Sequence, residues 1–293
     1  MYTDLFGRPC VKLGLHHHTT LSDGRCTPEQ TAGMYRQSGY DAIAITDHWV
    51  FGPGDAINGF PILSGGEYHT GVRDGFEGVY HIVCLCPEKE PVLDKSMTAQ
   101  QVIDGIHEAG GLAVLAHPAW SLNSPEKIKA LRGIDAIEIY NTVSDRGFSR
   151  RADASLIIDL LAAEGYLYPL LASDDSHYYE AEGNFSDSCT AFIMAQCDST
   201  EPEAIKNAIL QGRFYASTGP ELHLSVRDGI AVVDCSEVSE IVFLSNFVFS
   251  KGRTITGSCL THGEYTVQPG ETFLRAYVTD SKGRRAWSNC VKL

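Results

Sequence analysis

An apolar run near the start of the chain ends in three consecutive histidines: Val11-Lys-Leu-Gly-Leu-His16-His17-His18-Thr-Thr-Leu-Ser-Asp23-Gly. Side chains alternate between the two faces of a β-strand, so His16 and His18 point to one side and His17 points to the other. A Ser-Asp-Gly turn adds a carboxylate soon after this pair. The stretch therefore predicts a strand that places paired imidazoles, followed by an acid, at its C-terminal end.

Further strand-like runs follow, and helix signals separate several of them. The runs are Asp41–Thr46, Ile62–Tyr68, Val79–Cys86, Leu112–Ala116, Ala136–Tyr140, Leu167–Ala172 and Thr190–Ala195. Thr27-Pro28 and Ser124-Pro125 join an N-cap residue to a proline at the first helical position, and Thr200-Glu-Pro-Glu repeats the device. Alternating β and α units of this kind predict the α/β class, with a mostly parallel sheet that is either open or closed into a barrel.

The pattern changes at Ser217-Thr-Gly-Pro220. Beyond it, short alternating runs are separated by turn dipeptides such as Asp228-Gly229, without a clear helix. We therefore expect a large unit over residues 1–219 and a small antiparallel β domain, of the sandwich type, over residues 220–293.

The composition is that of a globular chain with an acidic surface. Of 293 residues, 43% are hydrophobic, and 23 basic against 37 acidic residues give a net charge of −14. This charge argues against a nucleic-acid polymer as partner. Nine cysteines without a CxxC pair indicate neither a disulfide framework nor a zinc ribbon. Because no apolar stretch approaches the ~18 residues of a membrane span and the first residues lack a secretory signal, we expect a cytoplasmic protein without membrane contact.

Ligand-type side chains gather at the ends of the predicted strands, where groups from distant parts of a β/α sequence converge. They are His16, His18, Asp23, His48, Glu67, His81, His117, Asp175 and His177. Six imidazoles and three carboxylates without a thiolate suit catalytic Zn²⁺, Mn²⁺ or iron. The set is too large for one ion, so two or three divalent metal ions are expected. These ions would leave a positive hole in an acidic protein, which favours a small-molecule phosphate ester as substrate.

These motifs resemble those of PHP-domain proteins, the polymerase and histidinol-phosphatase superfamily. The resemblance covers about residues 10–215 and rests on the first histidine stretch, Ile45-Thr-Asp-His48, Glu67, His81, Ala116-His-Pro118 and Ser173-Asp-Asp-Ser-His177. It implies a distorted (β/α)7 barrel of the PHP type with a di- or trinuclear metal centre and phosphoesterase chemistry. No position of the family's ligand pattern is missing from this sequence.

The resemblance also implies how the ligands divide among the metal ions. One ion would be held by His16, His18, Glu67 and Asp175. A second would be held by Glu67, His81 and His117, and a third by Asp23, His48 and His177.

We expect a metal-dependent phosphoesterase that hydrolyses a small phosphorylated metabolite or nucleotide with a metal-activated hydroxide. Asp175, His48 and His177 are the candidate catalytic residues, and either histidine could protonate the leaving group. The tail, from Gly212-Arg-Phe-Tyr to Trp287-Ser-Asn, resembles a PHP branch with carbamate and aryl-ester hydrolases. A carboxylic ester or carbamate hydrolase is therefore the alternative, and a non-catalytic regulatory module is a third reading.

Phosphate groups beyond the metal ions usually need arginine. The candidate substrate-binding residues are Arg25, Asn141, Arg146, Arg150 and Arg213. Glu138 and Asn141 end the sixth strand-like run and are expected to line the pocket. His69, two residues after Glu67, points the same way as that carboxylate and is a candidate for a supporting contact.

Overall fold

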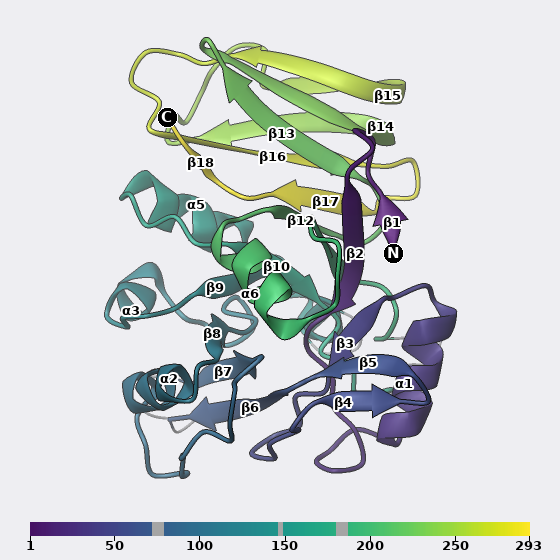
Figure 1. The fold of residues 1–293 in the computed structure, drawn as a ribbon. Helices are drawn as coiled ribbons and strands as arrows, with labels where there is room; N and C mark the ends of the chain where they lie inside the picture. Colours follow the sequence, from purple (N-terminus) through teal and green to yellow (C-terminus); the bar gives the residue numbers. More distant parts are fainter. Residues whose placement is uncertain (72–78, 146–148, 180–186) are drawn as a thin grey trace.

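The structure, a computed structural model, describes residues 1–71, 79–145, 149–179 and 187–293. It has the mixed α/β character that the sequence predicts (Figure 1). The helices are α1 (Pro28–Gln37), α2 (Ala99–Glu108), α3 (Pro125–Lys129), α4 (Thr142–Ser144), α5 (Ser155–Ala163) and α6 (Pro202–Leu210). The strands up to residue 200 are β1 (Tyr2–Thr3), β2 (Pro9–Gly14), β3 (Ala42–Ala44), β4 (Asp55–Ile57), β5 (Phe60–Leu63), β6 (Gly65–Thr70), β7 (Tyr80–Leu85), β8 (Leu112–Leu115), β9 (Ala136–Asn141), β10 (Leu170–Ser173) and β11 (Phe192–Ala195). The later strands are β12 (Phe214–Ser217), β13 (Leu222–Arg227), β14 (Ile230–Ser245), β15 (Thr254–Thr266), β16 (Phe273–Thr279), β17 (Arg285–Ser288) and β18 (Val291–Lys292).

Among the described residues the strands form two sheets. The larger sheet has 13 strands in total. Ten follow the order β13-β14-β16-β17-β12-β11-β2-β3-β5-β4, and β1, β15 and β18 pair with β2, β14 and β16. The smaller sheet has the order β10-β9-β8-β7-β6. The pairs β2–β3, β3–β5, β8–β9 and β9–β10 are parallel, whereas β6–β7, β7–β8 and β2–β11 are antiparallel. The sheets are therefore mixed rather than mostly parallel.

The expected distorted (β/α)7 barrel is not confirmed in the described part of the chain, because both sheets are open. Two isolated bridges, His17 with Ser176 and His48 with Glu67, join the sheets where a continuous ladder would be needed. The residues after β2 and β10 turn their side chains toward a common centre instead of extending the strands. Asp175 has a φ of 51°, which a regular strand does not tolerate. The hydrogen-bonded ladder thus stops where the candidate ligands begin.

The expected strand Ile62–Tyr68 is divided between the two sheets. Its first part is β5 and its second part is β6, with Ser64 between them. Gly65 packs so closely on the neighbouring strand that a Cβ there would lie 2.7 Å from the carbonyl oxygen of Cys84. This crossing brings Glu67 from one sheet to face the histidines that follow the other.

The helix signals act largely as expected. The Thr27 side chain accepts from the Gln30 backbone and completes a capping box at α1, and Ser124 caps α3. At α6 the N-cap is Glu201, which makes no side-chain cap bond, and Pro202 begins the helix. Among the described residues, no helix combines the length and apolar character that crossing a bilayer requires.

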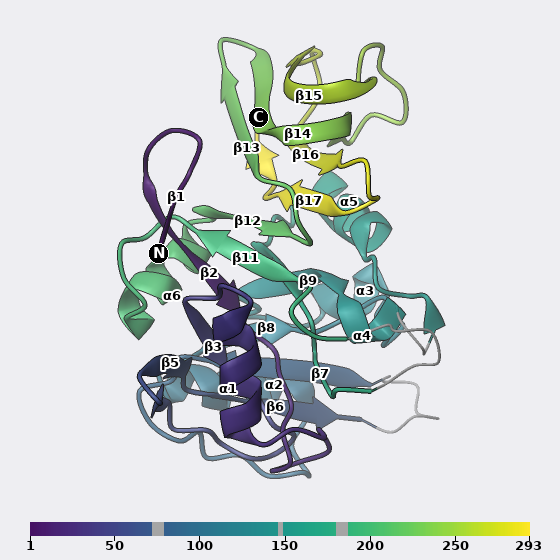
Figure 2. The ribbon, with the colours of Figure 1, turned by 90° about the vertical axis from the view of Figure 1, so that its right-hand side faces the viewer.

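The C-terminal strands are antiparallel, as expected, and lie in the upper part of the molecule (Figures 1 and 2). Their own apolar core includes Val233, Ile241, Phe243 and Leu274. The β12–β17 pairing joins them to the large sheet.

One buried ion pair also connects these strands to the rest of the chain. Arg275 on β16 is fully buried, and its Nε and Nη2 donate to the Asp159 carboxylate of α5 at 2.6 and 2.8 Å. Its Nη1 has no hydrogen-bond partner among the described residues. The charge of Arg275 therefore depends on Asp159 for its neutralisation.

Candidate metal centre

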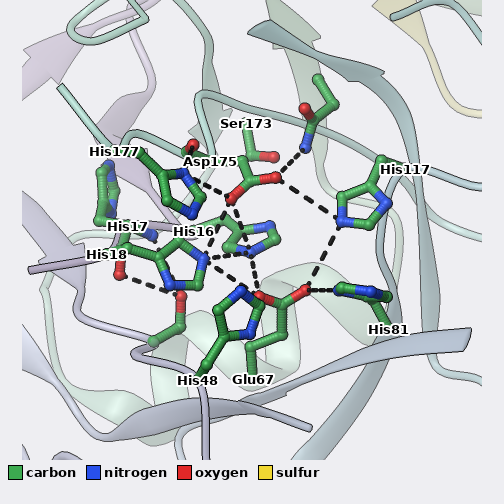
Figure 3. Close-up of polar contacts among 12 residues, drawn as sticks. His16, His17, His18, His48, Glu67, His81, His117, Ser173, Asp175 and His177 are labelled. Carbon is green, nitrogen blue, oxygen red and sulfur yellow. Dashed lines mark hydrogen bonds and ion pairs between the residues drawn. The ribbon is translucent and has the colours of Figure 1, made fainter. Parts of the chain in front are cut away.

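The nine candidate ligands converge at one place between the ends of the two sheets. Figure 3 shows all of them except Asp23 as labelled side chains. His16 and His18 follow β2, His48 follows β3, Glu67 lies in β6 and His81 in β7. Asp23, His117, Asp175 and His177 come from the loops after β2, β8 and β10. His16, His18 and Glu67 are fully buried, whereas half of the Asp23 side chain is exposed. The cluster thus runs from a buried floor to an open rim.

Four ligand atoms form the most compact group: His16 Nε2, His18 Nε2, Glu67 Oε2 and Asp175 Oδ1. The two imidazole nitrogens are 3.2 Å apart. His16 Nε2 lies 3.3 Å from each carboxylate oxygen, and His18 Nε2 lies 3.1 Å from Glu67 and 3.0 Å from Asp175. Ligands bound about 2.0–2.1 Å from one metal ion lie about 3.0–3.4 Å from their neighbours. The spacing of this group is therefore that of a coordination shell.

The hydrogen bonding of these atoms tests whether a metal ion fits. Glu67 Oε2, Asp175 Oδ1 and His48 Nδ1 are buried, and none has a hydrogen-bond partner among the described residues. Unpartnered buried polar atoms are costly and rare. Here all three converge with the histidine nitrogens on the same centre. A divalent cation bound by nitrogen and oxygen donors would satisfy them, so the residues present fit a metal ion.

Glu67 connects this group to a second one. Its Oε1 lies 2.7 Å from His81 Nδ1 and 3.5 Å from His117 Nε2, while its Oε2 lies 3.0 Å from His48 Nδ1. The compact trio here is His48, Glu67 and His81, with His117 at its edge. Glu67 thus belongs to both groups, and the second group contains His48 where the resemblance implies His117.

A third group lies at the exposed rim and contains Asp23, His48, His177 and also His18. His177 Nε2 is 3.4 Å from Asp23 Oδ1, and His48 Nε2 is 3.9 Å from Asp23 Oδ2. The rings of His18 and His177 stack at 4.2 Å. These contacts are longer than those of the buried group, so the rim is the more open of the candidate sites.

The carboxylates strongly favour positive charge on the buried imidazoles. Burial alone would lower the pKa of His16, but Asp175, Glu67 and Glu138 outweigh it and raise this pKa well above its usual range. In the same way, hydrogen bonds to Asp175 and Glu67 overcome burial and raise the pKa of His18 to about 9. The imidazoles in turn hold the pKa values of Glu67 and Asp175 well below the ordinary range. The site is therefore built to hold cationic charge.

Metal retention is expected to fall as the pH drops below about 9, because a ligating imidazole must be neutral. His16 and His18 have raised pKa values, so below them the metal-free protein holds protons that an incoming ion must displace. Above these values no proton opposes binding. Elemental analysis after dialysis at steps between about pH 6 and about pH 9 measures the trend. A metal content that rises toward low pH would contradict this prediction.

Glu138 is a buried carboxylate whose central position the sequence did not reveal. Its Oε1 accepts from His16 Nδ1 at 2.8 Å, and its Oε2 accepts from the His117 backbone N–H at 2.8 Å. Ser173 Oγ and Asn141 Nδ2 also donate to it. Because Glu138 occupies Nδ1 of His16, it leaves Nε2 free to bind metal. The strand-end pattern predicted that Glu138 lines the pocket. The structure instead shows that its carboxylate orients two candidate ligands, His16 and His117.

Replacing Glu138 with Gln is expected to weaken metal binding by about 10- to 100-fold. All four groups around the carboxylate act as donors, and a glutamine must turn its own N–H₂ toward one pair of them. Metal titration of the purified variant measures the effect. Glu164→Gln is the matched control, since that exposed carboxylate pairs only with Lys129 among the described residues. Unchanged metal affinity in Glu138→Gln would show that the carboxylate has no orienting role.

Asn141 lies beneath the site rather than in its cavity. The side chain is fully buried, and Nδ2 donates to Glu138 Oε2 at 2.9 Å and to Asp175 Oδ2 at 3.3 Å. Its Oδ1 accepts from the backbone N–H of Ser144 and caps α4. The structure thus places this candidate substrate-binding residue as a support for Asp175.

His17 points away from the centre, as the strand alternation predicts. Its Nδ1 donates to the carbonyl oxygen of Ala44, and its ring packs edge-on against Tyr35 of α1 at 4.3 Å. Burial lowers the pKa of His17 to about 3, so its ring is neutral. The residue belongs to the core beneath the site.

The candidate arginines are dispersed. The Arg25 guanidinium lies 4.9 Å above the Tyr179 ring at the rim, and the exposed Arg150 lies 3.4 Å from the Asp145 carboxylate. Arg146 is outside the described residues. Arg213 lines a different cavity, which shares no described lining residue with the one over the metal centre. None of these arginines is among the described residues that line the cavity over the metal centre.

A cavity of about 650 Å³ opens above the ligands, within the size range of small-molecule sites. Its walls add His69, Val79, Trp120, Val143 and Tyr179 to the ligand side chains. Trp120 stands nearly perpendicular to the rings of His81 and His117, and Tyr179 stacks on His177. The position of His69 agrees with its predicted supporting place. Trp120 and Tyr179 carried no metal-ligand pattern that could have singled them out in the sequence.

No sequence profile of a known family matches the chain, and no curated protein sequence matches it. Solved structures do. A two-domain protein from Bacteroides vulgatus, described as containing a predicted PHP-like metal-dependent phosphoesterase, has a TM-score of 0.55 and 15% identity, covering 100% of this chain and 97% of its own. A proposed metal-dependent phosphoesterase from Bifidobacterium adolescentis has a TM-score of 0.44 and 16% identity, covering 62% of this chain and 94% of its own.

An amidohydrolase from Chromobacterium violaceum, solved with sulfate and without metal, has a TM-score of 0.42 and 16% identity, covering 60% of this chain and 89% of its own. The first of these similarities extends over both the α/β part and the C-terminal strands. The chain therefore has the fold of a two-domain protein that contains a predicted PHP-like metal-dependent phosphoesterase.

Proposed function

We propose that the protein is a metal-dependent hydrolase and that its substrate is a small phosphate ester. The observation that carries this proposal is the group of four ligand atoms from His16, His18, Glu67 and Asp175, spaced like a coordination shell at the floor of an open cavity. The Bacteroides vulgatus protein of similar fold is described as containing a predicted metal-dependent phosphoesterase, which supports the same reaction class.

Divalent ions in such a site lower the pKa of a bound water and neutralise the charge on the substrate's oxygens. We propose two or three ions, Zn²⁺, Mn²⁺ or iron, because the donors are imidazoles and carboxylates only. Glu67 would bridge two of the positions, and Asp175 would complete the buried one. The division into residues 1–219 and 220–293 is part of the same proposal.

The histidines at the rim are placed to act on the leaving group. His48 and His177 both line the cavity, with about a fifth and a tenth of their side chains exposed. Their Nε2 atoms face Asp23, whose carboxylate orients them. Where the rim position carries no ion, we propose that His48 or His177 donates its Nε2 proton to the leaving oxygen, which would otherwise depart as an alkoxide.

A hydrolase for carboxylic esters or carbamates is the second candidate. No arginine or lysine lines the cavity among the described residues, and a neutral acyl group needs none, whereas phosphate groups usually recruit arginine. Both candidates use the same metal centre and differ in the group that is attacked.

A substrate panel on metal-loaded protein tests the proposal. We expect p-nitrophenyl phosphate or bis(p-nitrophenyl) phosphate to be hydrolysed, with loss of activity on chelation and recovery on adding Mn²⁺ or Zn²⁺. Turnover of p-nitrophenyl acetate or a carbamate without phosphoryl turnover would select the second candidate. Inactivity on the whole panel at full metal occupancy would overturn both.

A further inference from the structure

A second cavity, of about 590 Å³, lies where the C-terminal strands meet the rest of the chain. Its walls include Phe6 and Arg8 near the N-terminus, residues 212–215 at the start of β12, and most of β13, with Gln196, Asp234, Ser288, Asn289 and Val291 completing the lining. We call it the junction cavity. It contains Arg213, the arginine that the sequence singled out and the metal centre does not use.

The junction cavity gathers positive charge in an acidic protein. The guanidinium groups of Arg8, Arg213 and Arg227 line it, against one carboxylate, that of Asp234. Arg8 is paired with Asp4, and Asp234 accepts from His262 Nδ1. Arg213 donates to the neutral Asn207, and neither it nor Arg227 forms an ion pair with a described residue.

Two unpaired guanidiniums at one cavity are notable because the chain has 37 acidic residues available to neutralise them. Arginine presents its donors in a fork that matches a phosphate or carboxylate group. The polar side of the cavity is therefore suited to an anion.

The other side of the junction cavity is aromatic. The His223 ring packs edge-on between Phe6, at 5.0 Å, and Tyr215, at 5.5 Å. His223 Nδ1 accepts from Arg8 Nη2 at 3.3 Å, and its Nε2 donates to Glu221 Oε1 at 2.7 Å. An arginine can only donate, so these two hydrogen bonds hold the His223 ring between Arg8 and Glu221. About half of the Phe6 side chain remains exposed.

We propose that the junction cavity is a second ligand site, which binds a small organic anion. Arg213 and Arg227 would hold its phosphate or carboxylate group, and its apolar part would pack on Phe6 and His223. The volume is in the range of small-molecule sites. The site shares no described lining residue with the cavity over the metal centre and does not depend on that centre for its ligand.

Calorimetric titration with phenylphosphonate tests this, because its carbon–phosphorus bond resists hydrolysis. We expect a binding event that persists in Asp175→Asn, which impairs the metal centre. In the double variant Arg213→Gln/Arg227→Gln, this event should weaken by about tenfold or more, since each charged hydrogen bond contributes about a factor of ten. Arg132→Gln, which removes an exposed arginine between α3 and β9, is the matched control and should bind like the parent.

Benzoate and benzamide share an aromatic ring but differ in charge, so comparing them separates the contribution of the negative charge from that of the ring. Benzoate binding would assign a carboxylate ligand as well as a phosphate-like one, and uncharged benzamide should not compete. The proposal is overturned if the double variant binds phenylphosphonate as tightly as the Arg132→Gln control, or if Asp175→Asn abolishes all binding. A thermal melt of each variant confirms that the fold is retained.

Discussion

Replacing Asp175 with Asn is expected to lower kcat/KM by at least about three orders of magnitude and to reduce the metal content of the purified protein. Asp175 Oδ1 is buried without a hydrogen-bond partner among the described residues, 3.3 Å from His16 Nε2 and 3.0 Å from His18 Nε2. Asparagine has the same shape but no negative charge. The substitution therefore removes one charge from the buried ligand group while leaving the packing almost unchanged.

Two measurements separate this effect from misfolding. Elemental analysis reports the bound metal, and a thermal melt reports the fold. Asp198→Asn is the matched control, because that aspartate is exposed and outside the cavity of the metal centre. Full activity in Asp175→Asn at unchanged metal content would contradict the assignment of the buried group as the catalytic site.

Replacing Asp159 with Asn is expected to lower the free energy of unfolding by about 3 kcal/mol or more. Arg275 is fully buried and donates twice to the Asp159 carboxylate, while its Nη1 finds no partner among the described residues. An asparagine would leave the guanidinium charge inside the protein without an opposite charge. The loss arises from this stranded charge more than from the missing hydrogen bonds.

The double variant Asp159→Asn/Arg275→Met tests that reason. Methionine removes the buried charge and keeps apolar volume, so it should restore most of the stability lost in the single variant. Asp153→Asn is the control, because its pair with Arg285 is partly exposed and should contribute less than about 1 kcal/mol. A stable single variant in urea unfolding would show that Asp159 does not neutralise Arg275.

The candidate ligands could be predicted from local pattern alone. His16 and His18 share a strand face because side chains alternate, and this geometry needs no knowledge of the rest of the fold. His117 and Asp175 follow short apolar runs, so their places at strand ends could also be inferred. Thr27 and Ser124 marked helix starts for a similar reason, since a cap bonds to residues only a few positions away.

The supporting layer could not be predicted in the same way. Glu138 is separated from His16 by 122 residues, and nothing in its local sequence distinguishes a carboxylate that orients a ligand from one that lines a pocket. Asn141 was expected to touch substrate, but it is fully buried and supports Asp175. Which side of a strand end faces the cavity depends on the packing of neighbouring strands.

Residue type and short-range periodicity thus determined the candidate ligand set, the α/β class and the antiparallel character of the C-terminal strands, because each follows from bonds and side-chain directions within a few residues. Only the tertiary structure decided that the sheets stay open, that β12 and β17 join the C-terminal strands to the large sheet, and that Arg213 lies in the junction cavity. Those features depend on which distant segments pair, and pairing is chosen by the packing of the whole molecule rather than by any one stretch of it.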